Sequence, residues 1–147
     1  MTESAINSLI EKLRAVYSET TTEHILCPRN NGAVAEPDGY ADYKSGDGET
    51  MKIWLKLDRG RIVTTGFWTD GCAAAIACGS MASELAKGRL VTEALFIDAR
   101  EIANALVDLP EGNFHCAVFA EQALRMALKD CLETSREPWK KLYRKSK

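Results

Sequence analysis

The sequence lacks any continuous apolar run approaching the roughly 20 residues that a membrane-spanning helix needs, so we expect no membrane insertion. It also lacks a strong excess of charge of one sign, since 19 Lys and Arg are balanced by 21 Asp and Glu. We therefore expect no electrostatic nucleic-acid footprint. The N-terminus has acidic Glu3 and Glu11 and no apolar stretch typical of a secretory signal. These absences predict a cytoplasmic protein.

The five cysteines are an odd number and do not predict a disulfide framework. In a cytosolic chain such residues are first interpreted as free thiols or metal ligands. The 147 residues are 46% apolar, which is enough for one hydrophobic core without disulfides. We predict a single domain over residues 1–147, with its core at about 5–134 and a basic extension at 135–147.

The extension carries a run of basic residues. A solvated tail is the commoner interpretation of such a run, and a binding element is the alternative. The run consists of Lys140, Lys141, Arg144, Lys145 and Lys147.

The N-terminal part predicts two helices. Over residues 4–18, apolar residues recur at helical spacing and form one stripe of an amphipathic helix. A second short helix is predicted over Thr20–Leu26, and Pro28 ends it before turn residues at 30–32. The stripe of the first helix consists of Ile6, Leu9, Ile10, Leu13 and Val16.

A small antiparallel three-stranded sheet is predicted next. Met51–Leu57 alternates apolar and polar residues, which is typical of a half-buried strand. A tight turn at 58–60 joins it to Arg61–Trp68, which is rich in β-branched and aromatic residues. Tyr40–Lys44 is the candidate third strand.

The chain after Cys72 predicts helices. A first helix is predicted over Ala73–Lys87, with Gly88 as the residue that ends it. Asp98 and Glu101 are a capping pair at the start of a second helix. A long helix covers about 115–133, and its inner stripe consists of Ala117, Ala120, Leu124, Ala127, Leu128 and Cys131. Strands followed by helices predict an α+β fold, with the helices packed on one face of the sheet.

Two segments place soft ligands at helix starts. Cys72 lies between a predicted strand and a predicted helix, where free N–H groups and the helix dipole stabilise a thiolate. A small buried apolar residue is the equally supported alternative. His115 and Cys116 open the last predicted helix, and both residue types bind zinc or iron. The alternative there is a capping His beside a packed Cys.

The loop before Met51 carries two carboxylates, Asp47 and Glu49, next to flexible Gly46 and Gly48. Taken alone, a solvated acidic turn is its commoner interpretation.

The other cysteines are not predicted as ligands. Cys78 follows Cys72 by six residues, which turns it roughly 240° around a helix. We therefore predict Cys78 and Cys131 to be core positions. Cys27 lies close to His24, but without a second pair nearby a metal site there is disfavoured.

Four short motifs follow one another in a specific order: Pro28-Arg29-Asn30-Asn31-Gly32, Gly48-Glu49-Thr50-Met51, Gly71-Cys72-Ala73-Ala74-Ala75-Ile76-Ala77 and His115-Cys116. This order resembles the IscU/NifU family of iron–sulfur cluster assembly scaffolds. That family carries a PRN-x-G stretch, a C-G-D-x-M loop, a G-C-x-x-A-I-A helix start and a late H-C pair. The resemblance covers roughly residues 20–133.

The resemblance implies a scaffold or carrier that is not an enzyme. A two-iron, two-sulfur cluster would be built on it transiently and passed to recipient apo-proteins. The sulfur would come from a cysteine desulfurase, and Zn²⁺ or Fe²⁺ would occupy the same site as alternatives. The oligomeric state is left open, with a homodimer as one option.

The family's ligands transfer to this chain residue by residue. Cys72 and Cys116 match two ligand cysteines, and His115 matches the ligand histidine. Asp47 stands where the family has its first cysteine, and Glu49 stands where it has the loop aspartate. The resemblance thus implies cluster or metal binding by these five residues.

Asp47 is a departure from the family. A carboxylate is a harder ligand than a thiolate and cannot carry a persulfide, but it can ligate zinc or iron. Metal binding therefore survives this change better than cluster assembly does. A second departure is Leu109-Pro110-Glu111-Gly112, where the family has an L-P-P-V-K stretch that a dedicated chaperone recognises. That chaperone is not expected as a partner.

A scaffold is the leading hypothesis. The first alternative is a degenerate homologue that holds zinc or iron as a binding or regulatory protein, which the presence of Asp47 motivates. The second is a thiol enzyme with Cys72 or Cys116 as nucleophile and His115 as base, but the sequence shows no oxyanion-hole signature.

Overall fold

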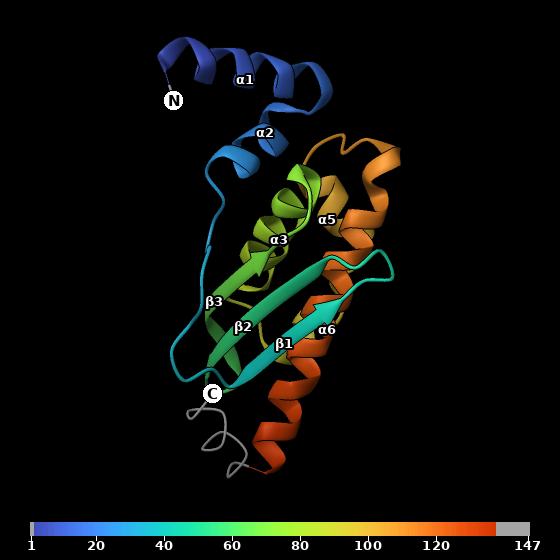
Figure 1. Cartoon of the computed structure of the whole chain (residues 1–147). Coiled ribbons are helices and arrows are strands. Elements are labelled where there is room, and N and C mark those ends of the chain that lie inside the picture. The colour runs from blue at the N-terminus through green and yellow to red at the C-terminus, as the bar shows by residue number, and fades with distance from the viewer. Residues whose placement is uncertain (1, 138–147) are drawn as a thin grey trace.

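The computed structural model describes residues 2–137 of the chain, and the basic run at 140–147 lies outside them. The described residues form six α-helices, one 3₁₀ turn and three strands (Figure 1). In chain order these are α1 (Glu3–Val16), α2 (Glu19–Leu26), β1 (Gly39–Lys44), β2 (Thr50–Asp58), β3 (Arg61–Thr69), α3 (Ala73–Ala86), α4 (Val91–Ala94), α5 (Ala99–Ala105), η1 (Glu111–Asn113) and α6 (Phe114–Arg136).

The strands form one antiparallel sheet in the order β1-β2-β3. The alternation in β2 buries Met51, Ile53 and Leu55 completely, and helices α3, α5 and α6 lie on that side of the sheet (Figure 1). The predicted α+β fold, with three antiparallel strands and helices on one face, is confirmed. The short helix α4 was not predicted, since four residues carry too little periodicity to be recognised.

The two helices that carry the candidate cysteines meet through small side chains. The buried residues of α3 are mostly alanines, and α6 turns a stripe of alanines and leucines inward. Small side chains let helix axes approach closely. The predicted inner stripe of the long helix is confirmed, because all of its members are buried: Ala117, Ala120, Leu124, Ala127, Leu128 and Cys131.

Gly39 sets how closely α6 packs against β1. A Cβ atom at this position would overlap Cys131 Sγ and the carbonyl oxygen of Ala127. Any side chain at position 39 would therefore push the helix off the sheet.

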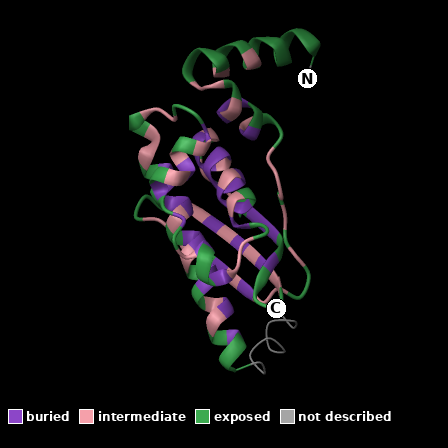
Figure 2. Ribbon diagram, turned by 180° about the vertical axis from the view of Figure 1, so that it is seen from behind, coloured by how far each residue is buried: buried purple, intermediate pink, exposed green. Residues whose placement is uncertain are grey.

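Helix α1 forms where the periodicity predicts it, but its apolar stripe is not part of the core. None of its residues is buried, and Ile6, Leu9 and Val16 are exposed. Figures 1 and 2 show α1 standing apart from the sheet and its helices. An amphipathic pattern predicts a helix, but it does not say whether the apolar side meets the chain's own core.

A buried polar cluster fixes α2 and the segment after it to α3. Ser80 Oγ accepts a hydrogen bond from the Arg29 backbone N–H (2.8 Å) and lies 2.7 Å from His24 Nδ1. The Ser80 hydroxyl can donate to Nδ1 or accept from it, according to the tautomer of His24, so one hydroxyl links the helix and the segment that follows it. Burial is the main cause that lowers the pKa of His24 below 6.5, and the nearby Arg29 charge adds to it. His24 is therefore a structural residue, as expected.

Among the described residues, no helix is both long enough and apolar enough to cross a membrane.

The His24 contact predicts an acid-sensitive stability. The pKa of His24 is lower in the folded chain than in the unfolded chain, so the unfolded chain binds the extra proton first as the pH falls below about 6.5. The stability that neutral His24 provides is thus present above that pH and lost below it. His24→Asn keeps an acceptor near Ser80 but does not titrate. Urea unfolding at pH 7.5 and 5.5 is expected to show a larger loss of stability for the wild type than for His24→Asn. Equal losses would contradict this role for His24.

The burial of the cysteines predicts their reactivity. Cys78 and Cys131 lie in the core as expected, whereas Cys72 and Cys27 are exposed. Burial also raises the pKa of the Cys78 thiol, which removes the reactive thiolate. A thiol reagent added to the folded, metal-free chain is expected to label Cys72 and Cys27 quickly and Cys78 and Cys131 only on unfolding. Peptide mass measures the labelling. Labelling of Cys78 as fast as Cys72 would show that the Cys78 thiol is accessible and would contradict this prediction.

Candidate metal centre

Two helix starts bring the candidate thiols together. Cys72 is the N-cap residue of α3 and is exposed, and Cys116 lies in the first turn of α6 and is buried. Their Sγ atoms are 3.9 Å apart, although 44 positions separate the two residues in the chain. For comparison, two thiolates on one tetrahedral zinc ion lie about 3.8 Å apart, given Zn–S bonds of about 2.3 Å. The pair therefore has the spacing of two ligands of one metal ion.

The segment before Cys72 is tied to the start of β2. Asp70 Oδ1 accepts a hydrogen bond from the Thr50 backbone N–H (2.8 Å), and the Thr69 hydroxyl donates to the Thr50 carbonyl (2.7 Å). Thr50 follows Glu49 directly, so these bonds hold the carboxylate loop beside Cys72. A Cβ atom at Gly71 would lie 2.7 Å from Glu49 Oε2, which shows that this carboxylate rests against the backbone next to Cys72.

The loop at 45–49 places both predicted carboxylates beside His115. The loop is closed by hydrogen bonds from the Ser45 N–H to the Glu49 carbonyl (2.8 Å) and from the Gly48 N–H to the Ser45 carbonyl (3.0 Å). Gly48 has a φ of +89°, which favours glycine. Asp47, Glu49 and His115 line one cavity of about 130 Å³, together with Tyr43, Ser45, Val118, Phe119 and Gln122.

One residue of the cavity lining has an unsatisfied polar atom. Ser45 Oγ is buried and has no hydrogen-bond partner among residues 2–137. A buried hydroxyl without a partner is costly. Ser45 belongs to the lining of the same cavity as Asp47, Glu49 and His115.

Electrostatics set the protonation of the buried thiol. Burial raises the pKa of Cys116 to about 12, and the charges of Cys72 and Glu49 act in the same direction. The side chain of Asn113 opposes this shift only partly. His115 Nε2 lies 3.5 Å from Cys116 Sγ. Cys116 is thus a protonated thiol beside an imidazole, and only a cation or a base at the site would convert it to thiolate.

Tyr17 is a neighbour of the thiols that the sequence did not reveal. Burial raises the pKa of its hydroxyl first, and the charges of Cys72, Cys116 and Cys78 raise it further. The ring is half-buried and packs against the core. A tyrosine at the end of the first helix carries no sequence signal for this position, because the contact depends on how α2 folds back on α3.

The predicted site residues therefore gather at one end of the fold without forming a closed metal site. Within residues 2–137, no set of three or more His, Cys, Asp or Glu side chains is already arranged around a single ion. The two sulfurs have ligand spacing, whereas the carboxylates and His115 surround the neighbouring cavity. Cys27 and His24 lie elsewhere, at α2.

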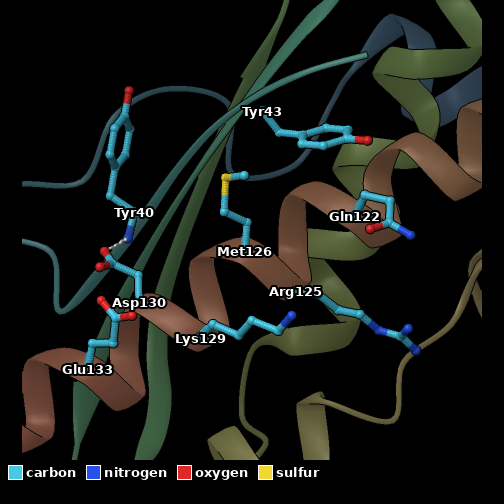
Figure 3. Close-up of a pocket in the computed structure, with 8 residues that line it drawn as sticks. All are labelled: Tyr40, Tyr43, Gln122, Arg125, Met126, Lys129, Asp130 and Glu133. Carbon is cyan, nitrogen blue, oxygen red and sulfur yellow. Dashed lines mark hydrogen bonds between the residues drawn. The ribbon is translucent and has the colours of Figure 1, made fainter. Parts of the chain in front are cut away.

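A second groove lies between β1 and α6 (Figure 3). The Tyr40 backbone N–H donates to Asp130 Oδ2 across it (2.8 Å). The groove has a volume of about 450 Å³ and no Cys or His in its described lining: Tyr40, Tyr43, Gln122, Arg125, Met126, Lys129, Asp130 and Glu133. It is therefore not a candidate for soft-metal binding.

Known proteins share both the sequence and the fold. The family profile of the NifU-like N terminal domain matches residues 16–137. The iron–sulfur cluster assembly scaffold protein IscU 1 of Archaeoglobus fulgidus is 41% identical over 116 residues, which cover 78% of this chain and 76% of that protein. The protein named iron–sulfur cluster assembly enzyme IscU in Drosophila melanogaster is 38% identical over 122 residues, covering 79% of this chain and 78% of that one.

A solved structure has the same fold. A protein of Fervidobacterium islandicum AW-1, named as an iron–sulfur cluster assembly scaffold for the SUF system, superposes with a TM-score of 0.63 at 20% identity. The match covers 78% of this chain and 98% of that one. The profile covers most of the chain, and the relatives exceed 30% identity over most of their own lengths. The chain therefore belongs to the family of NifU-like N-terminal domains, which includes the IscU scaffolds.

Proposed function

We propose that this chain is an iron–sulfur cluster assembly scaffold, which binds iron or zinc, holds a two-iron, two-sulfur cluster transiently and passes it to recipient proteins. The observation that carries the proposal is the 3.9 Å separation of Cys72 Sγ and Cys116 Sγ at two converging helix starts. The names of the relatives support it, since they assemble clusters as scaffolds. A cysteine desulfurase would supply the sulfur.

Cys72 and Cys116 would be the two fixed ligands of this site, and the remaining ligands would come from Asp47, Glu49 and His115. These three residues line the adjoining cavity, and their side chains are not arranged around a single metal position. A loop containing Gly46 and Gly48 can adjust its backbone to bring a carboxylate to the metal. Such ligands on a loop also suit a scaffold, because the site must open again to release its cargo.

Asp47 also supports a second candidate function. A carboxylate in place of the family's first thiolate favours the harder ions Zn²⁺ and Fe²⁺ over a sulfide-bridged cluster. In that case the chain would be a degenerate homologue that holds one metal ion as a binding or regulatory protein.

The first test of the proposal is metal content. The purified chain is expected to carry about one zinc or iron ion, and the double variant Cys72→Ala/Cys116→Ala is expected to carry almost none, because both soft ligands are gone. Cys27→Ala removes an exposed thiol at α2 and is the matched control, with metal content unchanged. Circular dichroism checks that the double variant folds. Unchanged metal in a folded double variant would refute the site.

The second test separates the two candidate functions. Asp47→Cys restores a third thiolate, so a cluster reconstituted anaerobically with iron, sulfide and a desulfurase is expected to survive a chelator longer than in the wild type. Asp42→Cys is the matched control, since it adds a thiol at an exposed position of β1. The measurement is the decay of visible cluster absorbance.

Each outcome of this comparison is informative. Equal or faster decay in Asp47→Cys would show that the carboxylate is no handicap and would favour an assembly-competent wild type. A wild type that forms no cluster at all, while Asp47→Cys does, would favour the degenerate metal-holding protein.

A further inference from the structure

The carboxylates and the exposed thiol of the candidate site come from different parts of the chain, and two residues join those parts. Asp47 and Glu49 belong to the loop before β2, whereas Cys72 follows β3. Thr50, the first residue of β2, comes directly after Glu49, and Asp70 comes two residues before Cys72. The contact between Thr50 and Asp70 therefore sets how near the carboxylate loop lies to the thiols.

The Thr50–Asp70 contact extends the β2–β3 ladder beyond its last regular pair, Met51 and Thr69. The Asp70 N–H donates to the Thr50 carbonyl oxygen (3.3 Å), as in an ordinary antiparallel pair. The Thr50 N–H, however, donates to the side-chain Oδ1 of Asp70 (2.8 Å). Since backbone groups make both bonds in a regular pair, the carboxylate of Asp70 takes the place of its own backbone carbonyl.

This substitution lets the chain leave the sheet beside Thr50. Because the side chain of Asp70 makes the second bond, its backbone is free to turn through Gly71 to Cys72, the N-cap residue of α3. The Thr69 hydroxyl supports the turn, since it accepts from the Gly71 N–H (3.1 Å) and donates to the Thr50 carbonyl (2.7 Å). Both backbone groups of Thr50 are thus held by the two residues that precede the turn.

The position of Thr50 also determines the position of the loop before it. Glu49 precedes Thr50 directly, and its Oε2 would lie 2.7 Å from a Cβ atom at Gly71. The Ser45 N–H donates to the Glu49 carbonyl (2.8 Å), so Glu49 in turn closes the loop that carries Asp47. A loop with two glycines needs such an anchor, because glycine allows many backbone conformations.

We propose that Asp70 is a positioning residue of the metal centre: by accepting the Thr50 N–H, it holds the carboxylates of the 45–49 loop within reach of Cys72 and Cys116. This inference rests on the proposed function, because it assumes that the loop supplies ligands to a metal held by the two thiols. Asp70 acts here through the backbone of Thr50 and not as a ligand. The role therefore requires an acceptor oxygen at position 70 and does not require a charge.

The test compares Asp70→Ala with Asp70→Asn in the full chain. Both variants lose the same charge, but only Asn keeps a side-chain oxygen that can accept the Thr50 N–H. The Zn²⁺ affinity, measured by competition with a chelator, is expected to be at least about tenfold weaker in Asp70→Ala than in Asp70→Asn, as is typical when a group that orients a metal ligand is lost. Equal affinities in the two variants would overturn the inference, because the acceptor oxygen would then have no effect.

A second measurement needs no metal. Amide hydrogen exchange of the metal-free chain is followed by mass on the peptide that contains residues 45–51. Exchange is expected to be faster in Asp70→Ala than in Asp70→Asn or the wild type, because the Thr50 N–H loses its acceptor and the loop loses its anchor. Exchange in Asp70→Ala that is as slow as in the wild type would also overturn the inference.

The other end of β2 provides a matched control. There Asp38 Oδ2 accepts from the Leu57 N–H (2.7 Å), seven residues beyond Thr50 and therefore about 23 Å away along the strand. Asp38→Ala and Asp38→Asn remove or keep the same kind of bond, and both are expected to leave the Zn²⁺ affinity unchanged. A loss of affinity in Asp38→Ala as large as that in Asp70→Ala would show a general effect of a weakened sheet and would overturn the positioning role.

The inference and the proposed function fail in different experiments. A Zn²⁺ affinity that Cys72→Ala/Cys116→Ala leaves unchanged would refute the proposed function. Zn²⁺ binding that depends on the two cysteines, but is equal in Asp70→Ala and Asp70→Asn, would overturn the inference alone.

Discussion

The packing of α3 against α6 is the contact on which the candidate site depends. Both helices present small buried side chains to each other, and both begin at the same end of the fold. Their first turns have N–H groups that are not used within the helices, and both dipoles point their positive ends toward the two sulfurs. Thiolate, sulfide and persulfide are all anions. The same contact that holds the core together therefore also brings the two sulfurs to one place, at two helix starts.

Local patterns were enough to predict most of the fold. The alternation in β2, the turn that follows it and the alanine-rich stripe of α6 each arise from neighbouring residues, so periodicity revealed them. The site was predicted as a set of residues from the order of four motifs. Its internal geometry was not, because the contact between Cys72 and Cys116 spans 44 positions and depends on how two helices pack.

The features that the sequence missed have a common cause. The position of Tyr17 near the thiols and the burial of the Ser45 hydroxyl are set by tertiary packing. Such positions give no periodic pattern in the sequence. The stripe of α1 is the converse case, since its periodicity is clear but the rest of the described chain covers it only in part and buries none of it. Periodicity reports which face of a helix is apolar, and only the fold decides whether that face is covered.

The close approach at Gly39 sets the distance between β1 and the C-terminal half of α6. Cys131, where the helix rests against β1, lies 15 positions from Cys116, a distance of about 22 Å along the helix axis at 1.5 Å per residue. If α6 were displaced from β1 at this contact, the helix axis would tilt and its N-terminal end would also move. A side chain at position 39 would therefore displace α6 near Cys131, and a tilt of the helix would carry that displacement toward Cys116.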